Sequence, residues 1–183
     1  MRIDRRFTAA GQDPYQGITF KSATSEIRNP DGSRVFYLPD IEVPADWSQV
    51  ACDILAQKYF RKAGVPSRLK AVEESDVPSW LWRMTIDTKA LEKLPAAERS
   101  EGERSAKQVF HRLAGTWTYW GWKGGYFDSE TDARAYYDEM CIMLCRQMAA
   151  PNSPNGSTPV CIGPMASTGR RKATTTSTTR PVS

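Results

Sequence analysis

Hydrophobic positions along the first 154 residues follow two periods, one typical of strands and one typical of helices. Residues 18–43 are rich in β-prone side chains on both sides of the turn sequence NPDG at 29–32, which predicts a β-hairpin. Residues 47–64 carry apolar side chains at helical spacing and predict a helix, with Asp46 as the N-cap and Gly64 just past the end. The apolar positions of this helix are Trp47, Val50, Ala51, Ile54 and Leu55.

Two more helices follow a less regular stretch over residues 66–102. The second helix is predicted through residues 104–122, at least as far as Gly115, with Val109, Phe110 and Leu113 on its buried side. Ser129 and Asp132 resemble a capping box, with Asp in place of Glu, at the start of a third helix that Pro151 ends. This helix has a wide apolar face formed by Ala133, Tyr136, Tyr137, Met140, Met143, Leu144 and Met148. The pattern predicts an α+β, mainly helical domain with a β-hairpin near its start.

After Pro154 the pattern stops. Residues 155–183 contain eleven Ser or Thr residues and no acidic residue, and neither the helical nor the strand period continues. Such a segment cannot bury enough apolar surface to offset the entropy of ordering it. We therefore expect two parts, a folded domain over 1–154 and a disordered Ser/Thr/Arg-rich tail over 155–183.

The charge of the chain is concentrated in that tail. The net charge of +4 equals the four basic residues of 155–183, which leaves 21 basic and 21 acidic residues in the body. A sequence pI of 8.9 would suggest a polyanionic partner, but here it reflects the tail alone, so nucleic acid is a poor candidate. The sequence has no run of 18 apolar residues and no secretory signal at its start. Four cysteines are too few for a disulfide scaffold, so we expect a reducing cytoplasm and no membrane association.

Few residues are candidates for chemistry. His111 is the single histidine and stands in a helical pattern, which favours a structural or surface role over a catalytic one. Cys141 and Cys145 share a helix face among apolar neighbours, so buried thiols are favoured over half of a metal site. We predict no metal site in this chain.

The aromatic block TWTYWGWKGGYF at 116–127 is the most unusual local composition. Aromatic side chains with interleaved cations can stack on single-stranded nucleic acid, but only Lys123 is basic here. A sugar-binding face is a second possibility. The favoured interpretation is a packed hinge between two helices, with glycines at 121, 124 and 125 allowing tight turns.

Longer strings are more specific. DWSQVACDILAQKYFRKAGVP, RLAGTWTYWGWKGGYFDSETDARAYYDEM and QMAAPNSP together resemble the N-terminal domain of adenosylcobalamin-dependent (class II) ribonucleotide reductase. The resemblance covers residues 41–154 in the same order, with variable spacing around 67–103. It implies that the full-length enzyme continues into an α/β barrel that is absent here.

The tail departs from the family at one position. In the family, NSP is followed by a run resembling QWFNTGLHWAYGIDGP, whereas here Pro154 is followed by NGSTPVCIGPMASTG. A nucleotide sequence that encodes the family run also encodes the tail sequence when it is read from its second base, codon by codon from Asn155 to Gly169. We therefore hypothesise a frameshift just after Pro154, which would make Cys161 an accident of the reading frame.

The resemblance implies the reduction of ribonucleoside diphosphates to 2′-deoxyribonucleotides by a thiyl radical, with adenosylcobalamin as cofactor and a thioredoxin-like reductant. The family's catalytic cysteines and most of its cobalamin site lie beyond the matching region, so no catalytic residue is assigned to this chain. Ser153 of NSP corresponds to the loop that meets the substrate, and it could instead only help the loop to turn. The alternative is a stand-alone nucleic-acid-binding module that uses the aromatic block and the basic tail. Of these two hypotheses, an enzyme fragment that is inactive alone is favoured.

Overall fold

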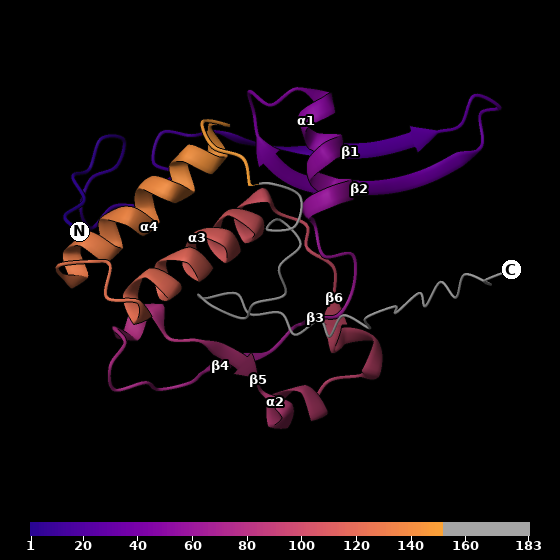
Figure 1. Cartoon of the computed structure of the whole chain (residues 1–183). Helices are drawn as coiled ribbons and strands as arrows, with labels where there is room; N and C mark the ends of the chain where they lie inside the picture. The colour runs from indigo at the N-terminus through magenta and orange to yellow at the C-terminus, as the bar shows by residue number, and fades with distance from the viewer. Residues whose placement is uncertain (152–183) are drawn as a thin grey trace, which may run out of the picture.

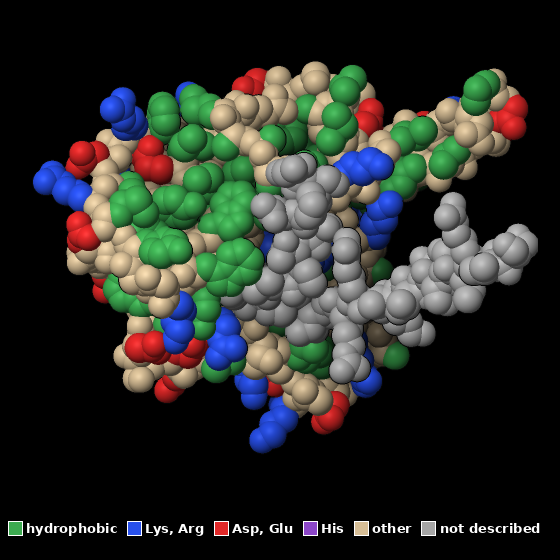
Figure 2. Space-filling view, in the orientation of Figure 1, with side chains coloured by type: hydrophobic (Ala, Val, Ile, Leu, Met, Phe, Trp, Pro, Cys, Tyr) green, Lys and Arg blue, Asp and Glu red, His purple; other side chains and the backbone are tan. Residues whose placement is uncertain are grey.

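The computed structural model describes residues 1–151, and its first elements are the predicted β-hairpin. Strands β1 (Phe20–Arg28) and β2 (Arg34–Pro44) pair antiparallel from Phe20 opposite Pro44 to Arg28 opposite Arg34. The NPDG turn closes with the amide of Gly32 donating to the carbonyl of Asn29 at 2.9 Å. The hairpin extends from the body as a two-stranded ribbon (Figures 1 and 2), and Ile41 and Val43 at its inner end are fully buried.

The first predicted helix is present but shorter than expected. Helix α1 (Gln49–Ile54) begins at Ser48, whose side chain accepts from the amide of Ala51, so the prediction of Asp46 as N-cap was wrong. A π-type turn over Leu55–Tyr59 follows directly. The chain becomes extended at Phe60, well before Gly64, because contacts from another part of the domain hold the backbone around Tyr59, as described below.

Helix α3 (Ala106–Lys123) confirms the second predicted helix and extends it through most of the aromatic block. Ser105 caps it in a capping box with Gln108, whose side-chain oxygen accepts from the amide of Ser105 at 2.9 Å. The three predicted core residues, Val109, Phe110 and Leu113, are all buried.

Helix α4 (Glu130–Cys145) returns alongside α3 after a short turn (Figure 1). Ser129 is its N-cap, as predicted, and accepts from the amide of Asp132, but the Asp132 carboxylate binds the Ser129 hydroxyl and the Ile3 amide instead of closing a capping box. The carboxylate of Asp132 accepts from the backbone amide of Ile3 at 2.9 Å and from the Ser129 hydroxyl, and these hydrogen bonds lower its pKa. Further along α4, Glu139 accepts from the amides of Phe7 and Thr8. The N-terminal segment is thereby attached along the length of α4.

Residues 66–102 contain more strand than the sequence indicated. Two short antiparallel pairs form there, β3 (Val65–Pro66) with β6 (Ser100–Glu101) and β4 (Leu69–Ala71) with β5 (Met84–Ile86). Helix α2 (Thr88–Glu92) and two 3₁₀ turns, Ser79–Leu81 and Ala96–Glu98, complete the region. The domain is α+β as predicted, but "mainly helical" overstated the helices, because three- and two-residue strands leave no readable period in a sequence.

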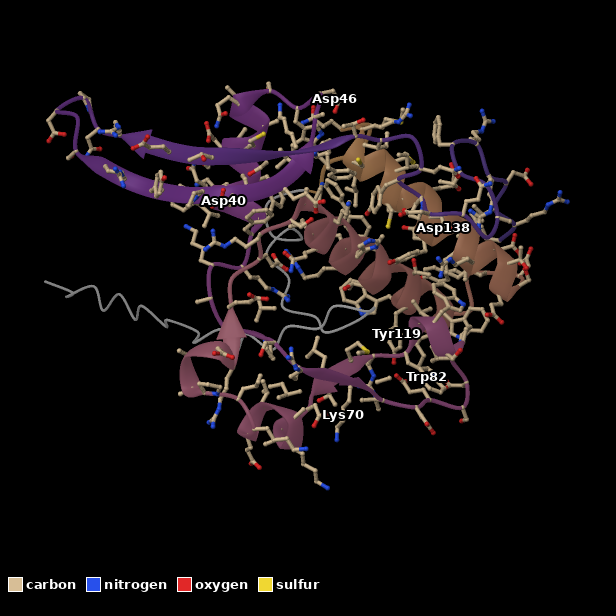
Figure 3. The ribbon with its side chains drawn as sticks, turned by 180° about the vertical axis from the view of Figure 1, so that it is seen from behind. Asp40, Asp46, Lys70, Trp82, Tyr119 and Asp138 are labelled. Carbon is tan, nitrogen blue, oxygen red and sulfur yellow. The ribbon has the colours of Figure 1, made fainter. Side chains whose placement is uncertain are left out.

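The core lies between α3, α4, α1 and the inner end of the ribbon. It includes Ile41, Val43, Leu55, Val109, Phe110, Leu113, Tyr137, Cys141, Leu144 and Cys145. A smaller cluster on the other side of α3 joins Val77, Leu81 and Tyr119, with Trp82 packed against it; Tyr119 and Trp82 lie together in Figure 3. Among the helices of residues 1–151, none has the length and apolar character needed to cross a bilayer.

Candidate functional site

The end of α4 directs the chain toward Ser153. The helix stops at Cys145, six residues before Pro151, so the prediction that Pro151 ends it was wrong. Gln147 adopts a left-handed conformation with φ of 56°. Its amide donates to the carbonyl of Leu144 at 3.1 Å, and the amide of Met148 donates to that of Met143 at 2.9 Å. These two bonds form a Schellman motif, which turns the chain sharply away from the helix axis.

Two aromatic side chains hold this exit segment. The indole Nε1 of Trp47 donates to the carbonyl oxygen of Cys145 at 2.8 Å. The hydroxyl of Tyr59 donates to the carbonyl oxygen of Pro151 at 3.2 Å. Both ends of the segment between Cys145 and Pro151 are therefore fixed to the region around α1, two residues before Ser153.

Tyr59 is positioned by an unusual turn. The amide of Phe60 donates to the carbonyl of Leu55 at 3.0 Å, which is the i to i+5 bond of a π-type turn. Such turns contain one more residue than an α-helical turn and are frequent at functional sites. The extra residue changes the direction in which Tyr59 leaves the helix, and it places the hydroxyl at the exit segment.

A buried ion pair fixes the backbone behind Tyr59. Arg112 and Glu103 are 2% and 5% exposed, and Nε of Arg112 lies 3.0 Å from Oε1 of Glu103. Nη2 of Arg112 also donates to the carbonyl of Tyr59 at 2.9 Å, while Glu103 accepts from the amide of Arg61 at 2.9 Å. This network explains why the π-type turn ends at Tyr59.

Sequence reasoning did not identify these positioning residues. Arg112 follows Val109 by three positions on the same helix face, so a charged residue inside an apolar stripe was the available signal. Glu103 carried no such signal, because it lies before the helix in a charged stretch. Trp47 was read only as an apolar position of the first helix, and Tyr59 was not singled out.

An apolar groove lies beside the exit segment. It encloses about 360 Å³ between α1, α3 and the end of α4. Val50 and Ile54 of α1 border it and are 66% and 49% exposed. Its lining is apolar except at Ser48 and Gln147 and at the polar ends of Trp47 and Tyr59, which are engaged with the backbone.

The aromatic block is packed rather than arranged as a stacking surface. The Tyr119 hydroxyl donates to Glu74 at 2.8 Å, and Nε1 of Trp122 donates to the carbonyl of Asp76 at 2.6 Å. Most of the block lies in helix α3, which extends to Lys123 and includes Gly121. The predicted hinge is therefore limited to the turn at Gly124 and Gly125. Hydrophobic side chains gather over the α3–α4 hairpin in Figure 2. Trp120 and Tyr126 of the block stay exposed, at 49% and 62%.

His111 and the cysteines have structural surroundings. Nδ1 of His111 lies 2.6 Å from the hydroxyl of Tyr137, and burial lowers the pKa of the imidazole. Cys141 and Cys145 are buried in the core, as predicted, and burial raises their pKa to about 12 and about 11. Thiols with such pKa values are poor nucleophiles at neutral pH. Within residues 1–151, no group of three potential metal ligands is close enough to hold an ion.

Ser153, the one predicted substrate-binding residue, lies outside the described residues, as do Cys161 and the rest of the tail. What the structure provides is the attachment of the chain up to Pro151. The candidate site is therefore the anchored exit segment between Cys145 and Pro151, together with the groove beside it.

Comparison with known proteins identifies the family. The profile of the class II vitamin B12-dependent ribonucleotide reductases matches residues 21–147. The chain belongs to this family. It is 67% identical over 154 residues to a vitamin B12-dependent ribonucleotide reductase of Bradyrhizobium diazoefficiens, and 65% identical over the same length to that of Agrobacterium fabrum. Each alignment covers 84% of this chain and 12% of the relative.

A more distant member of the family, the vitamin B12-dependent ribonucleotide reductase of Rhodopirellula baltica, is 28% identical over 144 residues, or 79% of this chain and 11% of that protein. The chain thus spans about 12% of the length of the nearer relatives. The family match over residues 21–147 contains Trp47, Tyr59 and Cys145, and it ends within the exit segment.

The described residues do not fit adenosylcobalamin. The groove beside the exit segment, at about 360 Å³, is far too small for a corrin ring and its nucleotide. A wider hollow beside His111 is lined by charged groups that pair with other side chains, Arg5 and Arg134 with Asp138 and Lys107 with Glu42. His111 has its Nδ1 on Tyr137.

Proposed function

We propose that this chain serves as the N-terminal part of an adenosylcobalamin-dependent ribonucleoside-diphosphate reductase. The whole enzyme would reduce ribonucleotides to 2′-deoxyribonucleotides with adenosylcobalamin and a thioredoxin-like reductant in the cytoplasm. The names of relatives at 67% and 65% identity support this assignment. The chain alone would be inactive, because its buried cysteines, Cys52, Cys141 and Cys145, are not the family's catalytic thiols.

The role of this part is to present the loop that carries Ser153 to the substrate. The observation that carries the proposal is the double attachment of the exit segment, by Trp47 at Cys145 and by Tyr59 at Pro151. A loop fixed two residues before Ser153 can hold a hydroxyl and backbone amides ready for hydrogen bonds to a nucleotide. In the intact enzyme the remaining side of that pocket would come from the α/β barrel.

The domain boundary after Pro154 is part of the proposal. The alignments with the nearer relatives extend over 154 residues, which leaves 29 of the 183 residues unmatched. That number equals the length of the proposed out-of-frame tail, 155–183. Resequencing the gene across the codons for residues 151–159 tests the boundary. A frame that continues without an extra or missing base, and that does not reach the family run in any frame, would refute the frameshift.

A chimera tests the function. Residues 1–154 of this chain would replace the matching segment of the Bradyrhizobium diazoefficiens relative. We expect the chimera to reduce ribonucleoside diphosphates in the presence of adenosylcobalamin and a dithiol. The 183-residue chain alone should show no ribonucleotide reduction under the same conditions. A chimera that folds but binds no nucleotide would overturn the assignment.

The role of Ser153 is tested in the same chimera. Replacing Ser153 by Ala should raise KM with a smaller effect on kcat, because one hydrogen bond to the bound nucleotide is lost. The matched control is Ser22→Ala on the exposed surface of β1, which should leave both constants unchanged. Equal KM values for the two variants would refute substrate contact by Ser153.

A further inference from the structure

The short helix α1 presents apolar side chains to solvent. Val50 and Ile54 are four positions apart, so they lie on one face, and they are 66% and 49% exposed. The opposite face buries Cys52. An aliphatic pair beside an apolar groove is unfavourable in water and is typical of a surface that another element covers.

The groove is continuous with the exit segment. Gln147, Ala149, Ala150 and Pro151 line it together with Val50 and Ile54. Whatever follows Pro151 in a longer chain therefore starts at the edge of this groove. The alignments cover only 12% of the length of the nearer relatives, and under the proposed function, in which this chain is the N-terminal part, most of the remaining length follows Pro151.

The chemistry of the lining selects an apolar occupant. The hydrogen-bonding groups of Trp47 and Tyr59 are already used by backbone carbonyls, and they offer no free donor to a polar ligand. Most of the remaining lining is hydrocarbon from Ala51, Leu55, Val109, Phe110, Leu113 and Leu144. Small-molecule sites combine an apolar wall with several convergent polar groups, and this groove has few of them.

We propose that the groove bordered by Val50 and Ile54 is the docking surface for an apolar segment of the reductase portion that follows the matched region in the relatives. The inference rests on the proposed function, since it requires that this chain operates as part of a longer reductase. It adds a named contact surface, which would fix the direction in which the exit segment leaves the domain.

Thiol accessibility tests the proposal without relying on activity. Ile54→Cys would be introduced into the 183-residue chain, with Cys161→Ser, and separately into the chimera. Modification of the peptide that contains position 54 by a maleimide would then be followed by mass spectrometry. The matched control is Val35→Cys on the ribbon, where Val35 is 61% exposed.

We expect the thiol at position 54 to react at least about tenfold more slowly in the chimera than in the 183-residue chain, because a covered thiol reacts only when the contact opens. The thiol at position 35 should react equally in both. Adding Val50→Asp to the chimera should restore fast reaction at position 54.

Three results would overturn the docking proposal. Equal, fast reaction at position 54 in both proteins would show that the groove stays open in the longer chain. Protection in the 183-residue chain that grows with its concentration would show that a second copy covers the groove. Protection that is independent of concentration would assign the groove to this chain's own later residues or to a small apolar molecule.

The chimera separates failure of docking from failure of the proposed function. An active chimera with an unprotected thiol would refute docking alone, and an inactive chimera with a protected thiol would refute the function alone.

Discussion

Tyr59 and Pro151 are 92 positions apart in the sequence, and the hydroxyl of Tyr59 donates to the carbonyl oxygen of Pro151. This bond joins the turn after α1 to the last described residue of the exit segment. With the bond from Trp47 to Cys145, it fixes where the chain leaves the domain. The point at which the chain leaves the described domain therefore depends on two side chains of the α1 region.

Replacing Tyr59 by Phe should remove this anchor while keeping the ring. We expect the free energy of unfolding to fall by about 0.5–1.5 kcal/mol, the usual net value of one intramolecular hydrogen bond. In the chimera, KM for the nucleotide should rise. Urea denaturation and steady-state kinetics measure the two effects. Tyr126→Phe is the control, since Tyr126 is 62% exposed, and an equal effect of both variants would contradict the anchoring role.

Breaking the buried pair of Arg112 and Glu103 should be far more costly. Arg112→Met leaves the Glu103 carboxylate buried without its cation, and we expect a loss of about 3–5 kcal/mol in chemical denaturation. The double variant Arg112→Met/Glu103→Leu should lose less than Arg112→Met alone, because no unpaired charge stays in the interior. A double variant that is less stable than Arg112→Met alone would show that the bond from the Arg61 amide to Glu103 outweighs the cost of the unpaired buried carboxylate.

Gln147 is a position where glycine should be better than the natural residue. Its φ of 56° lies in the left-handed region, where a Cβ atom is disfavoured. We expect Gln147→Gly to raise the free energy of unfolding by about 0.5–1 kcal/mol, after the greater freedom of glycine in the unfolded chain is subtracted. Gln147→Ala keeps the Cβ atom and should give no gain. Thermal denaturation of the three proteins decides the matter, and equal stabilities would argue against strain at this turn.

His111 should make stability depend on pH near neutrality. Burial lowers the pKa of this imidazole in the folded state, so the unfolded chain binds more protons below its own pKa of about 6.5. The contribution is therefore fully present above that pH and decreases as the pH falls toward the folded pKa. Lys107, Arg134, Asp13 and Asp138 provide the charges that act on the ring.

The measurement is urea denaturation at several pH values from 8 to 5. The wild-type chain should lose stability over this range, and His111→Gln should lose less of it. Asp and Glu side chains with lowered pKa values act at lower pH and are common to both proteins. Parallel curves for the two proteins would show that another group is responsible.

Local signals in the sequence predicted the local parts of the fold. The NPDG turn and Ser129 determine structure through their own backbone geometry, so they were read correctly. The end of α1 was misread because the pair of Arg112 and Glu103, more than 40 positions away, holds the backbone at Tyr59. The end of α4 was misread because Pro151 is a stronger stop signal in sequence than a left-handed Gln147.

The apolar spacing of α1 predicted the helix but not the exposure of two of its apolar side chains. The spacing placed Val50 and Ile54 among the apolar positions of a helix, yet the structure leaves both exposed. The pattern was therefore accurate about the helix but not about what covers it. The candidate site could be predicted only as far as the resemblance reached, since Ser153 follows from the family motif and its anchors follow from tertiary contacts.

The attachment of the N-terminal segment to α4 sets the distance between the two ends of the described chain. Ile3 is bound at Asp132 near the start of the helix, and the exit segment leaves after Cys145 at its end (Figure 1). A helix of 16 residues is about 24 Å long, so the two ends of the described chain are held apart by a rigid spacer. An affinity tag or a fluorescent dye attached to Met1 would thus sit remote from the groove and leave it free for binding assays. An insertion between Cys145 and Pro151, by contrast, would detach the exit segment from Trp47 or Tyr59 and uncouple this domain from any chain that follows.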